Sequence, residues 1–254
     1  MSGVPAVPFD LSARARYARN AFHDDEYARR AATVRATMAA EGLSALIVFG
    51  EGRSPAIEYL TGFQAVFGKH ILLLTEDHAT LFTDGVLHGE PMHSMIWTCR
   101  VADVVVSLGP TYGAPFEEVA SLAAARLSSG TSVGVSDAHL MPRALWAQLD
   151  QSGAILLPSD AVGQARAFKS PAEVAVLKEA CAIADRALTA MIAAIKPGKT
   201  EAEIGAIAAA IIAESGASEA FPTAVSSGHY AGIKHATPGQ RVMEAGEPVF
   251  LDVG

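Results

Sequence analysis

The chain has 254 residues, half of them apolar and 18% charged, which is enough for one large domain or two ordinary ones and builds a core without disulfides or metal. Its net charge of −8 leaves no basic stripe to neutralise phosphates, which argues against a nucleic-acid partner. Its mean hydropathy is positive, but the longest apolar runs, at 43–49 and 204–213, fall short of the roughly 20 apolar residues that a membrane-spanning helix requires, so we expect no membrane segment.

The first residues and the two cysteines indicate the cellular compartment of the protein. Residues 1–22 contain Pro5, Pro8 and several arginines, and we expect an irregular arm without the apolar centre of a secretory signal. Cys99 and Cys181 lie far apart and lack CxxC spacing, so we expect two small buried side chains and no disulfide. Free cysteines are typical of a reducing compartment, and we predict a cytoplasmic protein.

Helical and strand patterns alternate from residue 23 to residue 165. Apolar residues at three- and four-residue steps predict a helix over 24–41, and the apolar run 43–50 predicts a strand buried on both faces. The segment 69–84 predicts a hairpin with its tip at Glu76 and Asp77. Further helices are expected at 114–127 and 141–151, and further strands at 102–109, 131–137 and 154–160. The first domain is therefore predicted to be α/β, with a mixed sheet covered by helices.

Two long helices in succession indicate a second domain from about residue 166. Ser170 is a predicted N-cap, Pro171 occupies the first turn, and Glu173 completes a capping box. Thr200 and Glu203 repeat the capping-box spacing at the start of the next helix. Both helix starts are thus predicted from local side-chain chemistry alone.

Two apolar segments, 221–228 and 247–254, predict strands joined by a glycine-rich loop that contains His229 and His235. A loop histidine is most often a surface residue, but small neighbours let a substrate approach the backbone, where an imidazole can donate a proton or a hydrogen bond. Asp252 stands alone in the apolar run VFLDVG, either as a solvated strand-end residue or as a metal ligand. Because the sequence stops inside this run, we expect further residues of the same fold to be missing.

Other catalytic motifs are absent from the sequence. No GxGxxG follows a predicted strand, and neither GxxxxGK[ST] nor GxSxG occurs, so nucleotide binding and serine hydrolysis have no support. The remaining histidines are scattered without HExxH or HxH spacing, and we expect them to be structural or surface residues.

The order of several motifs resembles a known family. KSPAE, a long helix, KPGKTEAE, a second helix, FPTAVSSGHYAGIKH and GEPVFLDVG together resemble the first half of the pita-bread hydrolases, such as aminopeptidase P, prolidase, methionine aminopeptidase and creatinase. IEYLTGF and the hairpin after it resemble the N-terminal domain of the prolidase and creatinase branch. The resemblance covers residues 27–254. It implies an arm at 1–22, a creatinase/prolidase-type α/β domain at 23–165, and the first half of an α+β pita-bread domain at 166–254.

The resemblance also implies a metal site. His235 matches the active-site histidine that contacts the substrate, and Asp252 matches the first of five metal ligands; the spacing of 17 residues between them fits aminopeptidase P. The five ligands would hold two divalent ions of Mn, Co, Zn or Fe, and the other four would lie beyond residue 254. Since at most one ligand is present, we expect residues 1–254 alone to be inactive by the metal route.

Further substrate contacts are implied at His229, Phe67 and Lys69. Phe67 and Lys69 lie in QAVFGKH, which resembles a creatinase segment whose aromatic and basic residues reach the site of a neighbouring subunit. Lysine in place of the family's arginine keeps the charge but loses the bidentate fork for a carboxylate. Alternatively, Lys69 simply begins a hairpin strand.

The resemblance thus predicts a homodimeric, metal-dependent hydrolase of an amide or peptide C–N bond, of the Xaa-Pro dipeptidase or aminopeptidase P type, acting on a dipeptide or small molecule. Two alternatives stay open: a metal-independent, creatinase-like amidinohydrolase that works through His235, and a non-catalytic pita-bread binding protein. Asp252 favours the metal-dependent enzyme, because metal-free creatinase carries no acid in this strand.

Overall fold

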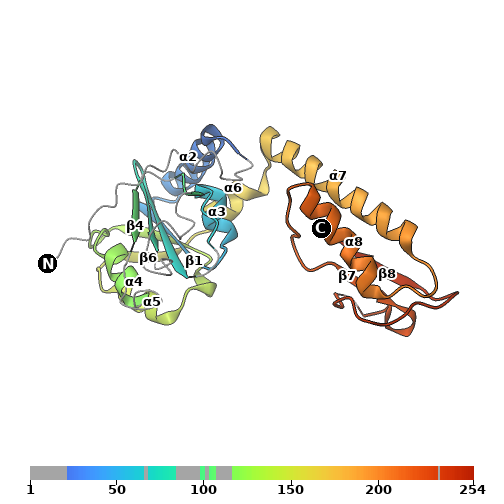
Figure 1. Cartoon of the computed structure of the whole chain (residues 1–254). Coiled ribbons are helices and arrows are strands. Elements are labelled where there is room, and N and C mark those ends of the chain that lie inside the picture. The colour runs from blue at the N-terminus through green and yellow to red at the C-terminus, as the bar shows by residue number, and fades with distance from the viewer. Residues whose placement is uncertain (1–21, 66–67, 84–97, 101–102, 107–115, 234) are drawn as a thin grey trace. The chain divides into compact units, whose positions relative to one another are not determined.

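The chain divides into two compact units, residues 1–168 and 169–254 (Figure 1). The computed structural model describes residues 22–65, 68–83, 98–100, 103–106, 116–233 and 235–254. The arm expected at 1–22 therefore lies outside the described residues, apart from Phe22.

A six-stranded mixed sheet forms the centre of the first unit. Its order is β4-β3-β2-β1-β5-β6, in which β1 pairs antiparallel with β2 and parallel with β5. The strands are β1 (Ala45–Glu51), β2 (Lys69–Thr75), β3 (Ala79–Thr83), β4 (Asp103–Val106), β5 (Ser132–Ser136) and β6 (Ile155–Pro158). The predicted hairpin is confirmed, because β2 and β3 pair antiparallel on either side of Glu76 and Asp77. The predicted mixed α/β sheet is likewise confirmed.

Helices cover both faces of this sheet. They are α2 (Asp24–Ala40), α3 (Pro55–Thr61), α4 (Phe116–Ala124), α5 (Arg143–Asp150) and α6 (Ala161–Ala167), with a short 3-10 turn, η4 (Ala138–Leu140). Leu46 and Val48 of β1 pack into a core with α2, α3 and α6, while Ala45 and Ile47 pack into a second core with α4 and α5. Successive side chains of a strand point to opposite faces, so a strand covered on both sides is apolar at successive positions, as predicted for β1 and as residues 45–49 are.

Two expectations for single features are corrected by the structure. Helix α6 was not predicted, because its small residues show little periodicity; it is defined by packing, which buries Ala161, Val162 and Ala165. Of the two cysteines, Cys99 is buried as predicted, but Cys181 is exposed, so the prediction for Cys181 was wrong. Neither cysteine forms a disulfide within the described residues.

The first core predicts a large loss of stability on truncation of Leu46, whose side chain is fully buried in β1. Leu46→Ala is expected to lower the free energy of unfolding by about 2–5 kcal/mol, because it removes transfer energy and leaves a cavity. Trp146 packs against the second core of this sheet, so urea unfolding followed by tryptophan fluorescence reports on the first unit. Leu140→Ala, at an exposed position of η4, is the control. A loss below about 1 kcal/mol for Leu46→Ala would contradict the assignment of this core.

The second unit has two helices and a two-stranded antiparallel sheet. Its elements are α7 (Pro171–Ala194), α8 (Glu201–Glu214), β7 (Ala224–Ser227), the 3-10 turn η5 (Gly228–Tyr230) and β8 (Val249–Asp252). Both predicted capping boxes are confirmed, with reciprocal side-chain bonds at the starts of α7 and α8. A small core joins α7, α8 and β7 through Met191, Ile204 and Val225. In the part of the chain that the structure describes, no helix combines the length and apolar character needed to cross a membrane.

Candidate functional site

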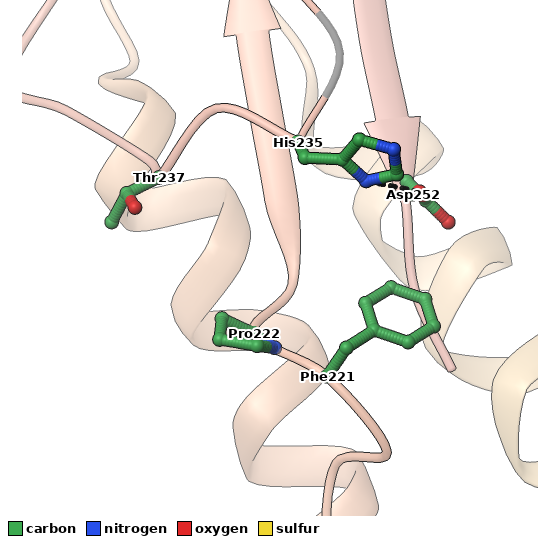
Figure 2. Close-up of a pocket in the computed structure, with 5 residues that line it drawn as sticks. All are labelled: Phe221, Pro222, His235, Thr237 and Asp252. Carbon is green, nitrogen blue, oxygen red and sulfur yellow. Dashed lines mark ion pairs between the residues drawn. The ribbon is translucent and has the colours of Figure 1, made fainter. Parts of the chain in front are cut away.

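His235 and Asp252 lie side by side in the second unit. Nδ1 of His235 is 3.7 Å from Oδ2 of Asp252, an ion pair when the imidazole is protonated (Figure 2). The His235 side chain is 78% exposed and the Asp252 side chain 32% exposed, so both are open to a ligand from solvent. The structure therefore brings together the residues predicted as catalytic histidine and metal ligand.

The alternation of side chains along β8 places Asp252 on the face away from the core. Asp252 is the last residue of the strand and pairs with Ala224 of β7. Val249, Leu251 and Val253 pack against the core of this unit, so alternation along the strand turns Asp252 to the opposite face. An acid in an apolar run is thus kept out of the core.

His235 has a left-handed backbone, with φ of 58°. For a residue with a Cβ this conformation costs roughly 1–2 kcal/mol, although histidine adopts it more often than most residues do. Costly conformations persist where the surroundings impose them and cluster at functional sites. The backbone of His235 therefore supports the hypothesis that this loop is shaped for function.

A pocket of about 440 Å³ is lined by His235 and Asp252 together with Phe221, Pro222 and Thr237. Figure 2 shows the Phe221 ring and Pro222 on the irregular segment that leads into β7, with Thr237 two residues after His235. The Phe221 ring lies close to Gly254, where an added Cβ would come within 2.8 Å of the ring. These three pocket residues were not singled out from the sequence, although the FP pair before β7 and the proximity of Thr237 to His235 were available signals.

The described residues do not by themselves form a divalent-metal site. A carboxylate such as Asp252 is a suitable donor for hard cations, but Mn²⁺ or Mg²⁺ needs several oxygen or nitrogen donors. Among the described residues, no group of three or more His, Cys, Asp and Glu side chains is placed to hold a metal ion. Asp252 can therefore serve only as one member of a ligand set.

The other predicted substrate contacts are not gathered at this pocket in the described structure. His229 lies in the exposed turn η5 with its ring 3.9 Å from that of Tyr230, and it is not among the described pocket residues. Lys69 begins β2 opposite Glu51, in the first unit. Phe67 lies outside the described residues. Substrate binding by these three residues stays a prediction.

Two protein families match this chain along its length. Residues 30–166, more than half of the chain, match the family described as Creatinase/Prolidase N-terminal domain. Residues 175–254 match Metallopeptidase family M24. The second match includes the whole pocket that His235 and Asp252 line.

Curated relatives and solved structures agree with these matches. An Xaa-Pro dipeptidase from Pyrococcus furiosus is 33% identical over 96 residues, which is 37% of this chain and 28% of that protein. The prolidase structure from Pyrococcus horikoshii OT3 is 22% identical, with a TM-score of 0.68 over 89% of this chain and 60% of its own. The dipeptidase PepE from Mycobacterium ulcerans is 26% identical, with a TM-score of 0.70 over 92% of this chain and 61% of its own. The chain therefore spans about 60% of the length of the solved structures that it resembles.

Proposed function

Because this chain belongs to the pita-bread family of creatinase, prolidase and the M24 metallopeptidases, we propose that it forms part of a metal-dependent hydrolase of an amide or peptide C–N bond. The proposed substrates are Xaa-Pro dipeptides or small amides of similar size. The observation that carries the proposal is the pairing of His235 with Asp252 in one pocket of the M24-like unit. Relatives named Xaa-Pro dipeptidase support the choice of substrate class.

In this proposal the two paired residues have different roles. His235, which is exposed to the pocket, donates a hydrogen bond or a proton to the substrate amide. Asp252 supplies one carboxylate to a metal centre whose other ligands are not among the described residues. A metal held in part by Asp252 would supply Lewis-acid assistance to the attack of water on the amide carbonyl. Phe221 and Pro222 offer an apolar wall on which the substrate packs.

Several finer assignments belong to the same proposal. We propose that His229, Phe67 and Lys69 contact substrate, with Phe67 and Lys69 reaching the site of a second subunit in a homodimer. The proposed metal is Mn, Co, Zn or Fe, with two ions in each site. The proposed domain limits are 23–165 and 166–254, after an arm at 1–22, and the proposed location is the cytoplasm.

A second candidate is a metal-independent, creatinase-like hydrolase. The observation that favours it is the same ion pair, since a carboxylate beside an imidazole also orients a histidine for acid–base work without metal. The presence of an acid at Asp252 is the reason for placing the metal-dependent enzyme first.

Metal removal distinguishes the two candidates. In a longer polypeptide that contains this chain, we expect hydrolysis of Xaa-Pro dipeptides, and dialysis against a chelator is expected to lower kcat/KM at least about a hundredfold, because metal contributes several kcal/mol to such reactions. Restoring Mn²⁺ should restore the rate, and a dipeptide without proline is the substrate control. Full activity with no bound metal would support the creatinase-like enzyme instead. Absence of activity on dipeptides and on creatine, with metal present, would favour a binding protein.

A further inference from the structure

One buried carboxylate holds both ends of the loop that carries His235. The loop spans 228–238, and Glu201, the first residue of α8, is only 6% exposed beside it. Oε1 of Glu201 accepts hydrogen bonds from the backbone N (2.8 Å) and the Oγ (2.7 Å) of Ser227, immediately before the loop. Oε2 accepts a hydrogen bond from the backbone N of Gly239 (3.2 Å), immediately after it. A single side chain therefore fixes the distance between the points where the loop leaves and returns.

Backbone bonds reinforce this connection. The N–H of Glu201 donates to the carbonyl of Arg241 (3.1 Å), and the N–H of Ala202 donates to the carbonyl of Gly239 (2.9 Å). The first N–H groups of a helix have no partner inside it, so here the returning loop caps α8. The positive end of the helix dipole also favours a carboxylate at Glu201. The start of α8 and the end of the loop thus hold one another.

An ion pair extends the network to the start of β8. Arg241 donates from Nη1 to Oγ of Ser227 (2.7 Å) and to Oε2 of Glu247 (2.9 Å), and it forms a second hydrogen bond to Glu247 through Nη2. The Ser227 hydroxyl accepts a hydrogen bond from Arg241 and donates one to Glu201. Glu201 is therefore connected to Glu247 through Ser227 and the Arg241 guanidinium. The hydrogen bond from Arg241 lowers the pKa of Glu247, which keeps this pair charged at neutral pH. Gly228 has a left-handed backbone, with φ of 60°, which favours glycine, and an added Cβ would also press on the side-chain ends of Arg241 and Glu247.

The position of the His235 imidazole depends on residues that do not contact it. His235 is mostly exposed, so packing around its own side chain does little to fix it, and its left-handed backbone must be imposed by the rest of the loop. A misplacement of about 1 Å in a reacting group can cost roughly a hundredfold in rate. Groups that hold such loops therefore contribute to the reaction without touching substrate.

We propose that Glu201 is a positioning residue that sets the place of His235 by clamping both ends of its loop. The effect of Glu201 on catalysis rests on the proposed function of His235. The clamp itself does not, because it consists of hydrogen bonds within residues 169–254. The two parts are therefore tested separately.

Hydrogen exchange on the 254-residue chain tests the clamp. In Glu201→Gln the amide cannot accept on both sides, so the backbone amides of 227–241 are expected to exchange about tenfold faster. Amides in the middle of α7 should keep their rates, and the exposed Glu214→Gln, the same change on the same helix, should alter neither segment. Unchanged exchange in 227–241 would overturn the proposal.

A second variant is needed if Glu201→Gln also speeds amide exchange in α7 and α8. Ser227→Ala removes the hydroxyl that joins Glu201 to Arg241 but keeps the backbone hydrogen bond to Oε1. Faster exchange confined to 227–241 in this variant supports the clamp. Exchange that is unchanged, or that rises equally throughout the second unit, counts against it.

Kinetics in an active polypeptide that contains this chain test the consequence for catalysis. Glu201→Gln is expected to lower kcat about 10- to 100-fold, as is usual for groups that orient a catalytic residue, with a smaller change in KM. If Glu201 acts through His235, adding Glu201→Gln to His235→Gln should cause no further loss. Fully additive losses would show a general structural role and overturn the proposal. If His235→Gln alone has no effect, the proposed function of His235 fails, and hydrogen exchange still judges the clamp.

Discussion

Replacing His235 by glutamine is expected to lower kcat for an Xaa-Pro dipeptide about a hundred- to ten-thousandfold, the range in which positioned acid–base groups contribute. Glutamine keeps a hydrogen-bonding side chain of similar reach but cannot carry or release a proton near neutral pH. Because His235 is 78% exposed, its loss should leave the free energy of unfolding almost unchanged. The measurement is steady-state kinetics in an active polypeptide that contains this chain, with circular dichroism as a check of folding.

His139→Gln is the matched control for this prediction. His139 is an exposed histidine in η4 of the first unit, and its replacement should change kcat less than about twofold. If His235→Gln retained kcat within the same margin, the residue would be a surface histidine. The pairing with Asp252 would then have no catalytic role.

The parts of this fold that follow from local chemistry could be predicted from the sequence. Ser170 with Glu173, and Thr200 with Glu203, satisfy helix N–H groups within one turn, so the starts of α7 and α8 need no knowledge of the rest of the chain. The continuous apolar run of β1 likewise predicts a strand covered on both faces. Helix α6 escaped prediction because its packing against distant residues, and not its own pattern, defines it.

The candidate site shows the same division between local and distant chemistry. His235 and Asp252 could be proposed from motif order, but their contact depends on the pairing of β7 with β8. Glu201 gave no signal in the sequence, because any glutamate in the first turn of a helix is explained by the helix dipole. Its bonds to Ser227 and Gly239 cross 26 and 38 residues, so only the folded chain distinguishes it from a solvated acid.

Asp252→Asn is expected to lower kcat/KM for an Xaa-Pro dipeptide about a thousandfold, because losing an anionic donor removes several kcal/mol of metal assistance. Asparagine keeps the size of the side chain and a carbonyl oxygen, so β8 should stay paired with β7. The effect should therefore appear in bound metal as well as in rate. Both quantities are measured on the same sample of an active polypeptide that contains this chain. Metal content is measured by mass spectrometry and rate by dipeptide hydrolysis.

The exposed Asp185 of α7 provides the same substitution away from the pocket, and Asp185→Asn should keep both metal content and rate. Three outcomes for Asp252→Asn have different meanings. Loss of metal and rate together supports the ligand role. Loss of rate with full metal content would instead give Asp252 the task of orienting His235, which lies 3.7 Å away. Retention of both would leave Asp252 as a solvated residue at the end of β8, and the metal centre would have to be sought elsewhere in the protein.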